Sequence, residues 1–146
     1  MSQENFAFTV QSSDPSANLT LAVWINDVCC LPPTAITQPL TVSHAIDDET
    51  ERPHKVRLEM TGKTDLHTVI DSQGHIVKDA LLQFHNFTLA DITVDSVMYL
   101  YAKYTHNHNG HSNSVTQPFN MSMGCNGTVE FEFSTPMYLW LLEHLV

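Results

Sequence analysis

The chain has 146 residues, a length typical of one domain and sufficient to bury a hydrophobic core. Hydrophobic residues make up 42% of it and charged residues only 15%, which excludes an intrinsically disordered chain. Six Lys and Arg stand against 16 Asp and Glu, giving a formal net charge of -10 at pH 7. Because this charge repels phosphate groups, neither nucleic acid nor an anionic membrane surface is expected as a partner.

Strands are predicted wherever apolar and polar residues alternate, because successive side chains of a strand point to opposite faces. In chain order, this pattern occurs at residues 6–10, 19–25, 40–46, 56–60, 80–84 and 129–133. Asn26-Asp27 predicts a tight turn that joins the second strand to the apolar run 28–31 as a hairpin. The acidic stretch 47–51 is predicted to be a solvated loop.

The remaining segments are less regular. Residues 62–79 are rich in turn formers, with a tight turn expected at residues 71–75, and a second short strand is expected at residues 87–94. Residues 97–104 are dense in aromatic and β-branched side chains and are predicted to be a strand, with a helix as the alternative. Residues 106–117 are polar and are predicted to be a loop. Thr135-Pro136 predicts the start of a short helix with Pro at its first helical position.

These elements predict an all-β fold in one domain spanning residues 1–146. About eight short strands separated by turns are typical of an antiparallel β-sandwich, of which the jelly roll is the commonest form, here with a short C-terminal helix. Residues 137–142 are apolar throughout, so we expect them to be buried by the fold or by a neighbouring subunit.

The cellular environment is inferred from what the sequence lacks. Residues 1–10 have neither the basic nor the apolar region of a signal peptide, and the run 137–142 is too short to cross a bilayer. The three cysteines at positions 29, 30 and 125 form no disulfide framework and are expected to be buried or half-buried thiols. We therefore expect synthesis in a reducing cytoplasm and no membrane insertion.

Nine histidines raise the question of a metal site. His106, His108 and His111 lie within six positions, and on an extended chain the first two would point the same way, as a transition-metal clamp requires. A solvated polar loop is the plainer interpretation. The carboxylates that flank the strands are candidates for calcium, namely Asp71, Asp79, Asp91, Asp95 and residues 47–49. None shows the dense spacing of a calcium loop, so solvated turns are preferred and no cofactor is expected.

No catalytic motif is present, so the chain is not expected to be an enzyme. Glu130 and Glu132 share a strand face, as paired glycosidase carboxylates can, but the exposed side of a half-buried strand is the preferred interpretation. Trp24, Tyr99 and Tyr101 are candidates for stacking on a sugar ring, although a second packed layer would also bury a Trp.

Several short strings resemble those of small proteins encoded by marine and cyanobacterial tailed phages, most of them uncharacterised. They lie in about the last two-thirds of the chain: residues 60–64, 67–68, 70–71, 104–106, 109–110, 123–127, 133–136 and 138–143. The resemblance implies a virion role. Where those proteins read His-Asp-Phe-Asn-Gly, residues 106–110 here read His-Asn-His-Asn-Gly. The missing carboxylate weakens the idea of an inherited metal site.

Two functions follow as hypotheses. The first is a structural or assembly protein of a tailed-phage particle, a head decoration or a tail or fibre component, assembled in the host cytoplasm. Its partners would be other virion proteins and further copies of the chain, contacted through the aromatic residues Phe6, Phe8, Tyr138 and Trp140. The second is a carbohydrate-binding jelly-roll module that recognises a host-surface glycan through Trp24, Tyr99 or Tyr101.

Overall fold

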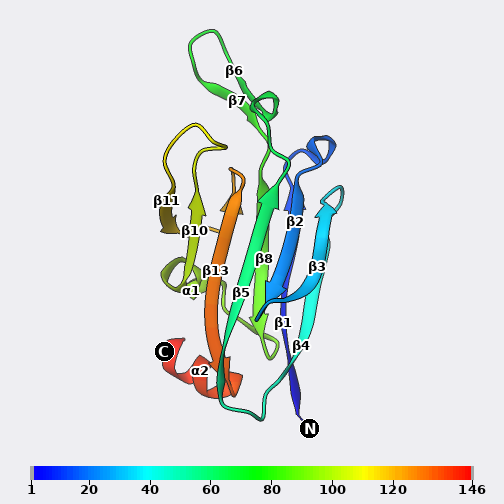
Figure 1. The fold of residues 1–146 in the computed structure, drawn as a ribbon, viewed down its shortest axis with the longest axis vertical. Helices are drawn as coiled ribbons and strands as arrows, with labels where there is room; N and C mark the ends of the chain where they lie inside the picture. Colours follow the sequence, from blue (N-terminus) through cyan, green and yellow to red (C-terminus); the bar gives the residue numbers. More distant parts are fainter. Residues whose placement is uncertain (1, 146) are drawn as a thin grey trace.

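Alternation of buried and exposed side chains along the strands builds two antiparallel sheets in the computed structural model, which describes residues 2–145. The predicted antiparallel β-sandwich with a short C-terminal helix is confirmed (Figure 1). The first sheet has the order β12-β8-β1-β4, with β9 paired to β8. Its strands are β1 (Gln3–Ser12), β4 (Leu40–Asp47), β8 (Leu82–Leu89), β9 (Ile92–Thr93) and β12 (Ser122–Met123).

The second sheet has the order β11-β10-β13-β5-β2-β3. Its strands are β2 (Thr20–Ile25), β3 (Val28–Ala35), β5 (Arg52–Thr61), β10 (Ala102–His106), β11 (Val115–Pro118) and β13 (Gly127–Thr135). A separate two-stranded hairpin, β6 (Thr68–Ile70) and β7 (Ile76–Asp79), interrupts the connection from β5 to β8. The helices are α1 (Asp95–Tyr101), α2 (Met137–His144) and the one-turn 3-10 helices η1 (Pro15–Ala17) and η2 (Asp65–His67).

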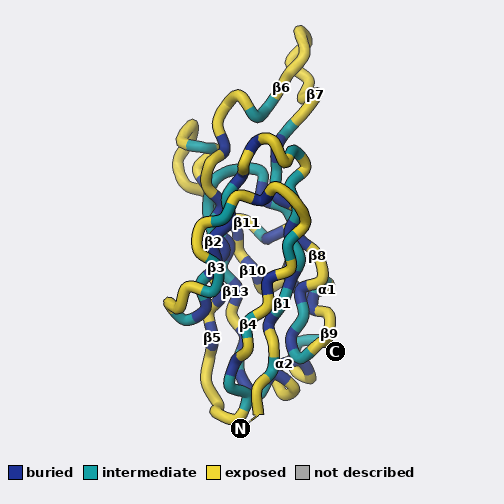
Figure 2. The backbone as a smooth tube through the Cα atoms, turned by 90° about the vertical axis from the view of Figure 1, so that its right-hand side faces the viewer, coloured by how far each residue is buried: buried dark blue, intermediate teal, exposed yellow. Residues whose placement is uncertain are grey.

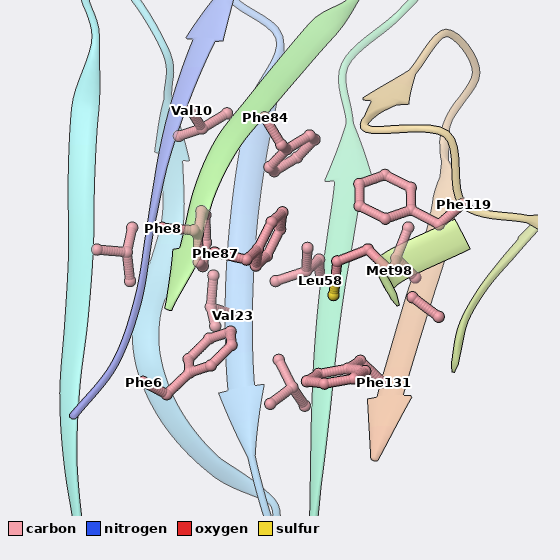
Figure 3. Packing of buried hydrophobic residues seen from close by; sticks show 14 of the residues in the cluster. Phe6, Phe8, Val10, Val23, Leu58, Phe84, Phe87, Met98, Phe119 and Phe131 are labelled. Atoms are coloured by element: carbon pink, nitrogen blue, oxygen red, sulfur yellow. The ribbon is translucent and has the colours of Figure 1, made fainter. Parts of the chain in front are cut away.

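Aromatic rings fill the space between the two sheets (Figure 3). The ring centroids of Phe8 and Phe87 lie 5.0 Å apart, and Phe119 meets the edge of Phe84 at 5.5 Å. Phe6 and Phe8, expected above at a protein interface, are 1% and 0% exposed and belong to this core. That expectation was wrong, because the inward face of β1 packs against the opposite sheet.

Strand β8 contains residues of both predicted runs, 80–84 and 87–94, while the later part of the second run forms β9. In β8 the buried side chains Leu82 and Phe84 are followed out of phase by the buried Phe87 and Leu89. Asn86 has a positive φ of 58°, and the pairing of β8 with β1 shifts register there. A β-bulge of this kind adds one residue and moves the following side chains to the other face, so the alternation breaks although the strand continues.

The strand predicted at residues 97–104 was wrong over its first half, which is helix α1. Val94, Val97 and Met98 are buried at helical spacing, and Asp95 accepts hydrogen bonds from the backbone N–H groups of Asn86 (3.0 Å) and Phe87 (2.7 Å). These bonds attach the first turn of α1 to the bulge of β8.

Two element boundaries also differ from the prediction. Residues 115–117, predicted to be part of a loop, belong to β11, which pairs with β10. At the C-terminus the helix begins at Met137, and Pro136 is its N-cap rather than its first helical residue. Among residues 2–145, no helix is long and apolar enough to cross a membrane.

His54, near the start of β5, has a buried imidazole ring, and the residue is 4% exposed. Its two ring nitrogens lie 2.7 Å from the Asn26 amide and 3.0 Å from the Thr135 hydroxyl, and its ring stacks on Phe133. Burial lowers the pKa of His54 below its ordinary value of 6.5, with the positive charge of Arg52 acting in the same direction.

We expect the stability of the protein to fall as the pH drops below about 6.5, where the unfolded chain binds a proton that folded His54 resists. Above that pH both states are neutral, so His54 contributes no pH dependence. The loss continues until the folded imidazole also becomes protonated. Thermal unfolding of His54→Gln should therefore show a smaller decrease in Tm between about pH 7 and pH 5 than the unmodified chain. His85→Gln, at an exposed position of β8, is the control. An equal decrease in His54→Gln would contradict the assignment.

Candidate interaction surfaces

Residues 63–79, here called the finger, leave the sandwich as the short helix η2 and the hairpin β6–β7. They project from one end of the molecule and are mostly exposed (Figures 1 and 2). Large aliphatic side chains of the finger lie in water: Leu66 (88% exposed), Val69 (45%), Ile70 (59%), Ile76 (65%) and Val77 (66%). Ile70 and Ile76 are directly opposite each other across the two strands. No second layer of the described chain covers this hairpin.

The tip of the finger is a well-defined turn, as predicted at residues 71–75. The carboxylate of Asp71 accepts hydrogen bonds from the backbone N–H groups of Gln73 and His75, both at 2.9 Å. The backbone carbonyl of Asp71 accepts a third bond, from the N–H of Gly74 (3.1 Å), and Gly74 has a φ of 85° that favours glycine. The hydrogen bond from His75 is the largest cause of a lowered pKa at Asp71.

The base of the finger is held by a buried lysine. Lys63 is 6% exposed, and its ammonium group lies 2.6 Å from the Asp79 carboxylate and donates to the backbone carbonyl of Gly124. The same carboxylate oxygen accepts a bond from the hydroxyl of Thr68 (2.7 Å). The backbone N–H and C=O of Lys63 are bonded in turn to the side chain of Asn126. Both strands of the hairpin are therefore attached to the loop before β13.

Two weaker contacts attach the finger to other parts of the sandwich. Lys78 lies 3.2 Å from Asp14, after β1, and Asp65 lies 2.8 Å from an imidazole nitrogen of His111, in the loop between β10 and β11. In addition, the hydroxyl of Ser13 donates to the backbone carbonyl of Asp79 (3.0 Å). With these contacts on several sides of its base, the finger extends from the body in a defined direction.

A second exposed apolar surface, here called the helical patch, lies on α1 and α2, toward the end of the molecule away from the finger (Figures 1 and 2). Tyr101 joins the two helices, because its ring meets the edge of Trp140 at 5.9 Å and that of His144 at 5.0 Å. The exposed members of the patch are Tyr99 (55%), Leu100 (62%), Tyr101 (39%), Tyr138 (65%), Leu139 (45%) and Leu142 (51%).

The expectation that residues 137–142 are buried is met by only half of them. Met137, Trp140 and Leu141 are buried by the fold, and Trp140 packs edge-on against Phe131 at 5.7 Å. Trp140 is 6% exposed, so it supports the patch from beneath and offers a partner little surface. A groove of about 370 Å³ beside α2 is lined by Leu139, Trp140 and Glu143 of the helix, by Glu51 and the start of β5, and by the end of β13.

The structure brings together two of the three predicted metal ligands, because the ring centroids of His106 and His108 lie 4.6 Å apart. His106 lies at the end of β10 and its Nδ1 accepts a bond from the backbone N–H of His108 (3.1 Å), while His111 turns away to Asp65. His108 and Asn109 have positive φ angles of 54° and 58°, so the strand ends before His108 and the expected extended clamp does not form. Within residues 2–145, no cluster of three His, Cys, Asp or Glu is arranged to hold a metal ion.

Most of the carboxylates that were candidates for calcium have structural partners instead. Asp79 binds Lys63, Asp95 binds the β8 backbone, and Asp71 forms the finger turn. Asp48 accepts a bond from the first helical N–H of α2, at Met137 (2.7 Å). Of the three cysteines, all free, Cys29 is exposed rather than half-buried, while Cys30 and Cys125 are intermediate as expected.

The candidate sugar and catalytic residues of the outer sheet face lie among charged side chains. Trp24 is half-buried, with the guanidinium of Arg57 4.5 Å from its ring centre. Glu130 forms an ion pair with Lys55 (2.5 Å), and Glu132 is exposed on the same strand face. Tyr99 and Tyr101 are not near Trp24 in the fold but belong to the helical patch, so the three aromatic residues do not form one platform.

Comparison with known proteins identifies no family to which this chain is similar. No protein-family model, curated protein or solved structure matches the chain.

We expect Lys63→Met to destabilise the finger, because the Asp79 carboxylate and the Gly124 carbonyl would lose a charged partner in a largely buried site. A cost of about 2–3 kcal/mol in the free energy of unfolding is predicted, measured by urea denaturation. Hydrogen exchange of the finger amides should accelerate more than that of β1.

The matched control is Lys78→Met, which removes the other lysine of the finger. Its ion pair with Asp14 is exposed and solvent-screened, so stability and exchange should stay near those of the unmodified chain. Equal effects of the two substitutions would show that the buried pair does not fix the finger.

Proposed function

We propose that this chain is a structural or assembly protein of a tailed-phage particle, either a head decoration or a tail or fibre component, that acts through protein–protein contacts. The observation that carries the proposal is the finger. A hairpin of two short strands is marginally stable in water, and aliphatic residues exposed on a projecting hairpin are a liability unless a partner covers them. Here the buried Lys63 and the half-buried Asp79 pair at the base of the hairpin and attach it to the sandwich, as a projecting contact surface requires.

The resemblance to phage proteins supports the same proposal, and several of its strings coincide with the finger and its anchors. Residues 60–64, 67–68 and 70–71 run from the end of β5 into the finger, and residues 123–127 include Gly124 and Asn126, which hold Lys63. These strings therefore lie where the fold builds the finger. The proposed partners are other virion proteins, and no catalytic role is proposed.

The alternative is a carbohydrate-binding module of the jelly-roll kind that recognises a host-surface glycan. A sugar-stacking site needs an open aromatic face with polar groups beside it. Arg57 already occupies the region over the Trp24 ring, so a sugar would have to displace it. Assembly is therefore the preferred function.

The test is incorporation into particles of a variant with a polar finger, Ile70→Thr with Ile76→Thr. Threonine keeps the β-branched shape that suits a strand but removes the apolar surface. Because both side chains are more than half exposed, Tm should change little, whereas the amount of the chain in purified particles should fall by about tenfold or more, the effect of a contact worth about 1.4 kcal/mol. Val28→Thr, at a 56% exposed valine of β3, is the control.

Undiminished incorporation of the finger variant would contradict the proposal. A glycan array tests the alternative on the same preparations. Glycan binding that is lost in Trp24→Ala, together with normal incorporation of the finger variant, would establish the carbohydrate-binding function instead.

A further inference from the structure

We infer that a hollow on the outer face of β5 binds ligands that carry two or more oxyanion groups, such as carboxylates or phosphates. The hollow has a volume of about 420 Å³, on the sheet in which β5 runs between β13 and β2 (Figure 1). No residue of the finger lines it, so the inference does not depend on the proposed assembly function. The lining residues are Asn26, Asp27, Arg52, Lys55, Arg57 and Glu130.

Both arginines of the chain line this hollow, and neither has an acidic partner. Three of the four lysines do pair with a carboxylate: Lys55 with Glu130 (2.5 Å), Lys63 with Asp79 (2.6 Å) and Lys78 with Asp14 (3.2 Å). The chain has 16 Asp and Glu residues, yet within residues 2–145 the guanidinium groups of Arg52 and Arg57 form no ion pair and no hydrogen bond. A guanidinium group has five N–H donors in a planar fork that matches carboxylates and phosphates. Both arginines therefore retain these donors for a ligand.

The sheet holds Arg57 in place without using its hydrogen-bond donors. Its guanidinium carbon lies 4.5 Å from the centre of the Trp24 ring, and the two residues are paired across β5 and β2. A tryptophan ring attracts a cation but offers it no hydrogen-bond acceptor. The indole thus positions the guanidinium and leaves its N–H groups for an oxyanion. A group that is already positioned loses less conformational entropy on binding.

The charges that line the hollow leave an excess of positive charge. Glu130 is neutralised by its pair with Lys55, so Asp27 is the remaining carboxylate against the two arginines. The side chain of Asn26 is already bonded to the ring of His54 and to the backbone N–H of Lys55. Because the net charge of -10 repels anions at long range, we expect modest affinity that arises from direct contact.

The spacing of the two arginines favours a ligand with charged groups at more than one place. Arg52 and Arg57 are five positions apart on β5, so their Cα atoms are separated by about 16 Å at the usual rise of a strand. Side chains that reach one hollow from positions this far apart are best bridged by two oxyanion groups. Citrate, with three carboxylates, and pyrophosphate, with two phosphates, are therefore the probes.

The experiment titrates each probe at neutral pH and constant ionic strength, by calorimetry and by the NMR signal of the Trp24 indole N–H. This signal is identified by its loss in Trp24→Phe, and it should shift because the ligand binds the arginine above the ring. At least one of the two probes should bind with saturation, and the tighter one shows whether carboxylates or phosphates are preferred. Acetate, with one carboxylate, should bind about tenfold more weakly, since it can make only one of the two charged contacts.

Two variants and a matched control locate the site. Arg52→Gln and Arg57→Gln should each weaken binding of the tighter probe by about tenfold, the effect of losing one charge-assisted contact. Lys103→Gln also removes an exposed positive charge from this sheet face, but outside the hollow, and should change the affinity by about twofold at most.

Three results would overturn the inference. The first is that neither citrate nor pyrophosphate binds the unmodified chain with saturation. The second is that acetate binds as tightly as the better probe. The third is that Lys103→Gln weakens binding as much as the arginine variants do, because the effect would then come from net charge rather than from this hollow.

Discussion

The contact between the ammonium group of Lys63 and the carboxylate of Asp79 determines which surfaces this protein can present. Both residues lie at the base of a hairpin that has too few strands and no second layer to be stable by itself. The pair joins the two ends of the hairpin, and the Gly124 carbonyl and the Asn126 side chain connect that junction to the sandwich. With the base fixed, the aliphatic side chains of the finger stay in water rather than folding back onto the body.

The sandwich acts as the rigid support for two surfaces toward its opposite ends. Its interior is filled by aromatic rings from both sheets, and most of its Asp and Glu residues lie outside the strands. A net charge of -10 makes copies of the chain repel one another at long range. The proposed assembly function rests on the exposed aliphatic side chains of the finger, which lie among the exposed charged residues Asp65, Asp71 and Lys78.

The sequence predicted the sandwich because buried side chains recur at every second position through the middle of β1, β5 and β13, and alternation records burial directly. It failed where a local feature changes the period: the bulge at Asn86 split β8 into two runs, and the β-like composition of residues 97–104 outweighed the helical spacing of Val94, Val97 and Met98. The tight turn at residues 71–75 was predicted, but the finger was not. The aliphatic pairs on each side of that turn resemble an ordinary buried hairpin. Their exposure depends on Lys63 meeting residues about sixty positions away, which no local pattern reports.

A cryo-EM map of the particle that contains this chain tests the central claim most directly, since the claim concerns what covers the finger. The account predicts protein density of a neighbouring subunit within about 4 Å of Ile70 and Ile76, the distance of apolar contact. A map in which the finger is surrounded by solvent, while neighbours touch the chain only through the outer faces of its sheets, would contradict it.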